Sequence, residues 1–257
     1  MDFRLLGPIE VSDGHRTLTL GGPKQRALLA TLLLHANEVV SRDALIDALW
    51  GATPPETAVT ALHVQVSHLR KLLDPERGDG GDRVLLTRPP GYVLVVDPDD
   101  VDVFRFERLA AAGREALARD DPARAAGDLA RALALWRGPP LADLAYEGFV
   151  QVTISRLEEL RLAALEDWLD AELQLGHHAA VVGELRALVS DHPLHERAQA
   201  QLVLALYRSG RQAEALEAYH RARGALTDEV GIEPSRPLRD LHTAVLRQDP
   251  GLDREGR

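Results

Sequence analysis

The pattern of apolar residues changes near residue 100, and this change sets the strongest limit on the fold. Residues 1–97 contain short apolar runs, glycines and one long amphipathic stretch, whereas most of residues 98–257 has helical periodicity. The run Asp97-Pro98-Asp99-Asp100 lies between them and is typical of a break between domains. The sequence therefore predicts a mainly α protein with an α+β domain at residues 1–97, a linker at 98–101, an all-α domain at 102–250 and a tail at 251–257.

The α+β domain is expected to contain strands, then three helices, then a hairpin. The strands are expected at residues 3–6, 9–11 and 17–20, the last because its apolar residues alternate with a period of two. Gly21-Gly22-Pro23 opens a first helix that ends near residue 36. Ser41 is a suitable N-cap for a second helix, which ends at Trp50 before Gly51.

The third expected helix, residues 57–73, contains no acidic residue although the protein as a whole is acidic. On a helical wheel its core face consists of Val59, Leu62, Val66, Leu69 and Leu73. A helix that enters the major groove needs an outer face without carboxylates, which would repel phosphates, and with side chains that reach base edges. The outer and flanking positions supply our candidate DNA contacts in this helix: Thr60, His63, Val64, Ser67, His68, Arg70 and Lys71.

This outer face has a simpler explanation, an amphipathic helix with a solvated and slightly basic surface. Acid-free windows of similar length occur elsewhere, for example at residues 197–213. The hairpin expected directly after the helix favours a DNA-binding surface instead. Its strands, residues 84–86 and 92–96, are joined by a turn that carries Arg88. A narrow minor groove attracts arginine, so such a turn could act as a wing.

Four runs in residues 1–97 resemble the DNA-binding domain of the Streptomyces antibiotic regulatory protein family: GPKQRALL (22–29), VSRDALIDALWG (40–51), ALHVQVSHLRKLL (61–73) and TRPPGYVL (87–94). The resemblance implies an OmpR-like winged helix with residues 57–73 as recognition helix and the hairpin as wing. It places Ser67, His68 and Arg70 where OmpR-like relatives have polar and arginine contacts, and Arg88 at the position of the wing arginine.

The resemblance also places Trp50 where a related tryptophan contacts a backbone phosphate, although Trp50 could equally be a core residue that closes the second helix. The chain departs from its relatives at Ser67 and His68, where they often carry arginine. Fewer arginines imply weaker binding per domain and a weaker dependence on salt, since each phosphate contact adds to both.

The second half contains one interval of 34 residues, from Gly176 to Gly210, which is the period of tetratricopeptide helix pairs. Small residues at 213, 215 and 222 around Tyr219 fit the second helix of such a pair. The same family carries a bacterial transcriptional activation domain here, and this chain resembles it at DVFRF (102–106), ALALWRGPPL (132–141) and LTDEVGIEPS (226–235). The resemblance is to the short form of the family and extends to about residue 250.

Charge and composition exclude several classes of protein. The chain has no cysteine, which excludes thiolate metal sites and disulfide scaffolds. The net charge of −10 would argue against nucleic acid, but residues 1–97 carry ten basic and twelve acidic side chains, so most of the acidity lies in the second half. The sequence indicates no catalytic residues and no cofactor. It also indicates no metal site, since a turn between helix pairs explains His192, His195 and Glu196 better than metal binding does.

We therefore expect a transcriptional activator of an antibiotic biosynthetic gene cluster and not an enzyme. The resemblance implies that it binds direct repeats near the promoter as a homodimer on double-stranded DNA and recruits RNA polymerase holoenzyme. By analogy, the turn at residues 51–56 could contact the polymerase. No stretch is long enough to span a membrane and no signal peptide begins the chain, so the cytoplasm is expected. The alternative is a tetratricopeptide scaffold for protein interaction whose winged helix is only structural.

Overall fold

The computed structural model describes residues 1–74 and 84–253, which form two compact units. Unit 1 contains residues 1–109 and 132–161, and unit 2 contains residues 110–131 and 162–257. The bounds of these units differ from those of the predicted domains, because the chain leaves unit 1 and returns to it. The predicted domain division stays a prediction. The predicted linker at 98–101 stays a prediction about domain boundaries, and residues 254–257 of the predicted tail lie outside the described residues.

Two short antiparallel strands begin unit 1, β1 (Asp2–Arg4) and β2 (Glu10–Ser12), with Phe3 opposite Val11. The third strand expected at residues 17–20 is wrong, because only one isolated bridge joins Thr17 to Ser12. The Leu18 amide still donates to the Val11 carbonyl at 2.8 Å, and Leu20 is buried. The alternating pattern therefore predicted the burial of Leu20 correctly. The chain reaches Gly21, however, before a β-ladder forms.

Three helices form the centre of unit 1: α1 (Pro23–Leu34), α2 (Arg42–Trp50) and α3 (Ala58–Leu73). The Ser41 hydroxyl accepts a hydrogen bond from the Ala44 amide at 3.1 Å, and Gly51 has a φ of 59° after Trp50. These two caps confirm the predicted start and end of α2. Helix α1 is buried on most sides and packs against both α2 and α3, so it supports the whole helical cluster.

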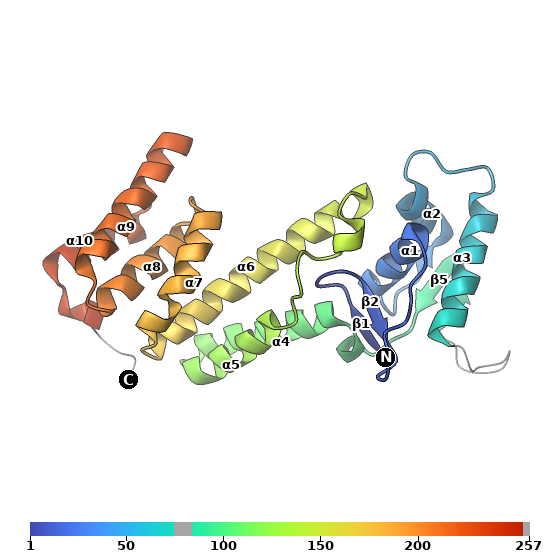
Figure 1. Ribbon diagram of the computed structural model, residues 1–257, viewed down its shortest axis with the longest axis horizontal. Coiled ribbons are helices and arrows are strands. Elements are labelled where there is room, and N and C mark those ends of the chain that lie inside the picture. Colours follow the sequence, from blue (N-terminus) through green and yellow to red (C-terminus); the bar gives the residue numbers. More distant parts are fainter. Residues whose placement is uncertain (75–83, 254–257) are drawn as a thin grey trace. The chain divides into compact units, whose positions relative to one another are not determined.

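A three-stranded sheet completes the winged helix (Figure 1). The expected hairpin is present as β4 (Leu85–Arg88) and β5 (Gly91–Leu94), with Thr87 opposite Tyr92. A two-residue strand that the sequence did not indicate, β3 (Val40–Ser41), pairs with β5 on its other edge. The strand order β3-β5-β4 therefore joins the start of α2 to the wing.

The helices after the winged helix confirm the mainly α class. They are η1 (Pro98–Asp100), α4 (Asp102–Ala118), α5 (Pro122–Leu133), η2 (Ala142–Leu144), η3 (Gly148–Val150) and α6 (Gln151–Gln174). The division between the units falls within α4, α5 and α6. Unit 2 continues with α7 (His178–Asp191), α8 (Glu196–Arg208), α9 (Gln212–Ala225), the π-helical turn η4 (Leu226–Val230), α10 (Arg236–Arg247) and η5 (Pro250–Asp253).

The helices α7, α8 and α9 of unit 2 pack side by side as successive pairs (Figure 1). Gly176 and Gly210 both have positive φ, 84° and 73°, and they lie just before α7 and α9 respectively. Ala215, Ala218 and Ala222 are buried together with Tyr219, so small side chains let α9 approach its neighbours. This arrangement confirms a tetratricopeptide-like helical part. Among the described residues, no helix is long and apolar enough to cross a membrane.

Candidate nucleic-acid interface

The core face of α3 is formed by Ala58, Leu62, Val66, Leu69 and Leu73, which are all buried. Four of the five predicted core residues are therefore confirmed. Val59 is wrong, since its side chain is 45% exposed. The helix begins at Ala58, and the spacing of four residues from Leu62 back to Ala58 gives the first core position to the alanine.

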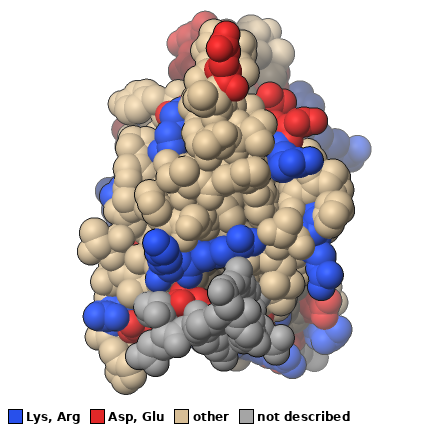
Figure 2. Space-filling model, turned by 90° about the vertical axis from the view of Figure 1, so that its right-hand side faces the viewer, with Lys and Arg blue, Asp and Glu red and all other residues tan. Residues whose placement is uncertain are grey.

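The opposite face of α3 is exposed to solvent and carries no carboxylate. Its exposed residues are Thr60, His63, Val64, Ser67, His68 and Lys71. Viewed from the side on which α3 lies, Figure 2 shows lysine and arginine side chains across a largely uncharged face. The structure thus brings six of the seven predicted helix contacts onto one accessible surface, whose hydrogen-bonding groups and one methyl-bearing valine suit base edges.

Arg70, the seventh predicted contact, is partly buried and joins α3 to the wing. Its Nε donates to the Leu85 carbonyl at 2.9 Å and its Nη2 donates to Thr87 Oγ1 at 2.8 Å. Its guanidinium carbon also lies 5.8 Å from the centre of the Tyr92 ring. Two directed bonds hold this side chain against the hairpin. No sequence signal indicated this role, because the partners lie 15 and 17 residues further along the chain.

We expect Arg70→Met to loosen the wing while α3 stays folded. The substitution keeps an apolar stem but removes both hydrogen bonds, and a bond from a charged donor contributes about 1.5–3 kcal/mol. Hydrogen exchange of the β4 and β5 amides should therefore become at least about tenfold faster. Lys71→Met is the matched control, since Lys71 is exposed. Equal exchange of the hairpin in both variants would show that Arg70 does not hold the wing.

The wing itself presents Arg88 to solvent at the end of β4, opposite Gly91. The backbone amide of Arg42, at the start of α2, donates to the Pro90 carbonyl at 3.3 Å. The wing tip is therefore attached to α2 as well as to α3. Arg88 is therefore exposed at the turn where the sequence predicted it.

Trp50, the remaining candidate, is half-buried at the end of α2. Both of its predicted roles, phosphate contact and closing residue, are compatible with this position. Beside it, the Lys24 ammonium donates to the Leu49 carbonyl and so caps the last turn of α2. This link between α1 and α2 was not evident from the sequence.

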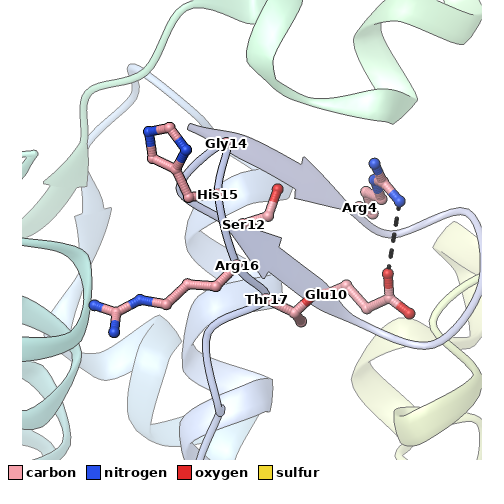
Figure 3. A pocket seen from close by; sticks show the side chains of 7 residues that line it. All are labelled: Arg4, Glu10, Ser12, Gly14, His15, Arg16 and Thr17. Carbon is pink, nitrogen blue, oxygen red and sulfur yellow. Dashed lines mark ion pairs between the residues drawn. The ribbon is translucent and has the colours of Figure 1, made fainter.

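A small cavity of about 220 Å³ lies at the β1–β2 strand pair of unit 1, and its charged groups are paired with one another (Figure 3). Arg4 points toward Glu10 at 3.8 Å and also binds Asp2 at 2.6 Å, while Arg16 points away and binds Asp13 at 3.2 Å. Burial tends to raise the pKa of Asp2, but hydrogen bonds from Arg4 and Arg105 lower it overall. With carboxylates against its arginines, this cavity offers little attraction for an anion.

A groove of about 580 Å³ lies on α7, α8 and α9 of unit 2. Leu202 and Ala218 contribute to its apolar lining, and ion pairs at its rim join Arg186 to Glu214 and Arg221 to Glu217. Across the described ranges 1–74 and 84–253, no three His, Asp or Glu side chains are grouped to hold a metal ion. His195 instead pairs with Glu166 at 2.8 Å, and Glu196 accepts from the Ser235 amide.

Comparison with known proteins identifies both halves of the chain. Residues 16–94 match the family described as Transcriptional regulatory protein, C terminal, and residues 101–246 match Bacterial transcriptional activator domain. The regulatory protein DnrI of Streptomyces peucetius is 40% identical over 260 residues, covering all of this chain and 96% of the relative. The transcriptional regulator RedD of Streptomyces coelicolor is 41% identical over 256 residues, covering 98% of this chain and 72% of the relative.

A solved structure agrees with this assignment. Mycobacterium tuberculosis EmbR, in complex with a low-affinity phosphopeptide, superposes with a TM-score of 0.91 at 39% identity, over 98% of this chain and 68% of EmbR. These relatives are transcriptional regulators and not enzymes. The chain belongs to the Streptomyces antibiotic regulatory protein family, as a transcription regulator with a winged-helix DNA-binding domain and a bacterial transcriptional activator domain.

Proposed function

We propose that this regulator activates an antibiotic biosynthetic gene cluster by binding direct repeats near the promoter and recruiting RNA polymerase holoenzyme. The observation that carries the proposal is the acid-free, exposed face of α3 beside an exposed wing arginine. Such a face holds no carboxylate that would repel the phosphates of DNA. Relatives such as DnrI and RedD, which match over most of this chain, support the regulatory role.

Within this proposal, Thr60, His63, Val64, Ser67 and His68 contact bases or the backbone in the major groove. Lys71, Arg88 and Trp50 contact phosphates or the minor groove, and Arg70 holds the wing in place for them. One winged helix then offers few cations to the DNA. Two protomers on a direct repeat, placed head to tail about one helical turn apart, would compensate for this.

The contact with polymerase is assigned to the turn between α2 and α3. Its residues, from Gly51 to Glu56, are all exposed, and they combine Pro54 and Pro55 with the single carboxylate of Glu56. Replacing this turn's exposed side chains by alanine should leave DNA binding unchanged and lower transcription in a purified system. Loss of both activities together would contradict this assignment.

A mobility-shift experiment tests the proposal. Upstream regions of secondary-metabolite gene clusters from the source genome are compared with scrambled DNA of equal length while salt is varied. We expect retarded complexes on a direct repeat, and no equal complex on scrambled DNA. Failure to bind at low salt, or equal binding to both DNAs, would reject a sequence-specific regulator of such clusters.

Lys71→Ala should weaken binding to all DNA sequences to a similar degree. If Lys71 contacts a phosphate, the slope of log affinity against log salt becomes shallower by up to about one unit. Affinity for specific and scrambled DNA, measured at four or more salt concentrations, checks this. An unchanged slope would place Lys71 on the solvated face.

Ser67→Ala should instead change sequence preference, by about 1–3 kcal/mol at one base pair, if its hydroxyl contacts a base. Affinities for a set of operators with single base changes measure this preference. The salt slope should stay the same, which separates this variant from Lys71→Ala. A uniform loss across all operators would argue against base contact by Ser67.

The second candidate function, a protein-interaction scaffold, is favoured by the groove on α7, α8 and α9. Its volume suits a short peptide segment, and its apolar floor offers a place for side chains. Such a scaffold would still bind its protein partner after Lys71→Ala and Ser67→Ala, and it would not bind DNA. The mobility-shift experiment therefore distinguishes the two functions.

A further inference from the structure

The loop between β1 and β2, residues Leu5–Pro8, is held by a buried carboxylate that lies far away in the sequence. Asp102, the first residue of α4, is 1% exposed. Its Oδ1 accepts a hydrogen bond from the Leu5 amide at 2.8 Å and its Oδ2 accepts one from the Leu6 amide at 3.0 Å. Both oxygens are thus used by one loop. Leu5 and Leu6 are themselves fully buried, so water cannot replace Asp102 as the acceptor for their amides.

The same loop is held from a second segment, residues 137–142. The amides of Arg137 and Leu141 donate to the carbonyls of Leu6 and Leu5, each at 2.8 Å. The amide of Ala142 donates to the Gly7 carbonyl at 3.3 Å, and Arg137 Nη2 donates to the Pro8 carbonyl at 2.9 Å. The approach is close: a Cβ at Gly7 would lie 3.0 Å from the Arg137 Cβ, and the φ of Gly7 is +156°.

The segment that contains residues 137–142 is connected to α3 through contacts with α1. Directly after residue 141, η2 packs against α1, and Arg26 of α1 forms an ion pair with Asp143. Leu141, Leu144 and Val150 are buried to 1% exposure or less. Helix α1 in turn packs against α3. A continuous series of contacts therefore joins Asp102 and residues 137–150 to the exposed recognition face.

We propose that residues 102–109 and 132–150, which match the activator domain in sequence, are part of the folding unit that presents α3, so that the recognition face forms only when they are docked. Phe106 supports this from α4, since it is fully buried and its ring meets that of Trp136 at 5.2 Å and 88°. The consequence for DNA rests on the proposed function. The folding unit itself rests on these contacts alone.

Asp102 is the residue through which to test the proposal. Burial raises the pKa of Asp102, although the Leu5 and Leu6 amides oppose this. Asp102→Asn keeps the size of the side chain and leaves one oxygen acceptor where there were two. It therefore weakens the hold on the loop without opening a cavity.

The experiment is hydrogen exchange of the full chain at increasing sub-denaturing guanidinium concentration. In the wild type, we expect α1, α3 and residues 137–150 to lose protection at the same guanidinium concentration, as one cooperative unit. In Asp102→Asn, the Leu5 and Leu6 amides should exchange at least about tenfold faster, and the α3 amides should become faster by a similar factor. Asp99→Asn is the matched control, because that carboxylate is 66% exposed and pairs with Arg108 at the surface.

Asp143→Asn gives an independent variant at the other holding segment, where it removes the ion pair with Arg26. It should also speed exchange in α3. The proposal is overturned if α3 stays protected after residues 137–150 have opened, or if Asp102→Asn changes only the β1–β2 loop. Because exchange needs no DNA, absence of DNA binding in the wild type would reject the proposed function and leave this inference standing.

Discussion

Gly91→Ala is expected to destabilise unit 1 by about 3 kcal/mol or more and to abolish the ordered wing. A Cβ at Gly91 would lie 1.8 Å from the Val40 carbonyl oxygen and 2.8 Å from Ser41 Cα. Both neighbours are backbone atoms, so no side chain can rotate away. The β3–β5 pairing would have to separate, and with it the attachment of the hairpin to the start of α2.

Thermal unfolding and hydrogen exchange measure this effect. A loss of that size should lower the melting temperature of unit 1 by roughly 10 °C or more. Gly127→Ala is the control, because its Cβ would meet no atom within 4 Å and it lies within α5. There alanine should be neutral or stabilise by up to about 1 kcal/mol. An unchanged melting temperature for Gly91→Ala would mean that β3 does not pair with β5 as described.

Reversal of two charges, Lys71→Glu with Arg88→Glu, is expected to lower DNA affinity about a hundredfold or more at 0.1 M salt. Both side chains are exposed, one on α3 and one on the wing, so the fold should tolerate the change. Loss of two phosphate contacts makes the salt slope shallower by about two, and the new carboxylates add repulsion. Titrations of specific DNA over a range of salt concentrations measure both quantities.

The control changes net charge by the same amount at another place. Arg236→Glu with Arg239→Glu lies on α10 of unit 2, where both arginines are exposed. If overall charge governed binding, the two double variants would lose equal affinity. We expect the α10 variant to keep nearly all of its affinity, and an equal loss would reject α3 and the wing as the DNA-binding surface.

Features that depend on local pattern could be predicted from the sequence. The caps at Ser41 and Gly51, the outer face of α3 and the hairpin depend on residues close together in the chain, and all are present. The core position of Val59 was wrong because the wheel does not determine where a helix begins. Contacts between distant residues left no periodic signal.

The missed contacts are of this distant kind. Strand β3 has only two residues and is defined by its partner β5, about 50 residues later. Asp102 binds amides 96 and 97 residues earlier, and nothing in the DVFRF run marks that carboxylate as buried. For Arg70, the sequence supplied a cation of the right type but could not show that its donors are already used by the wing.

The bonds of Arg70 have a consequence for the operator. These bonds attach the wing to α3. In the proposed complex, the protein therefore sets the distance between the bases at α3 and the minor groove at Arg88. The DNA must therefore supply these two positions at a constant spacing. One base pair inserted between them would remove either the helix contacts or the wing contact, whereas the same insertion between two repeats would alter only how neighbouring protomers meet.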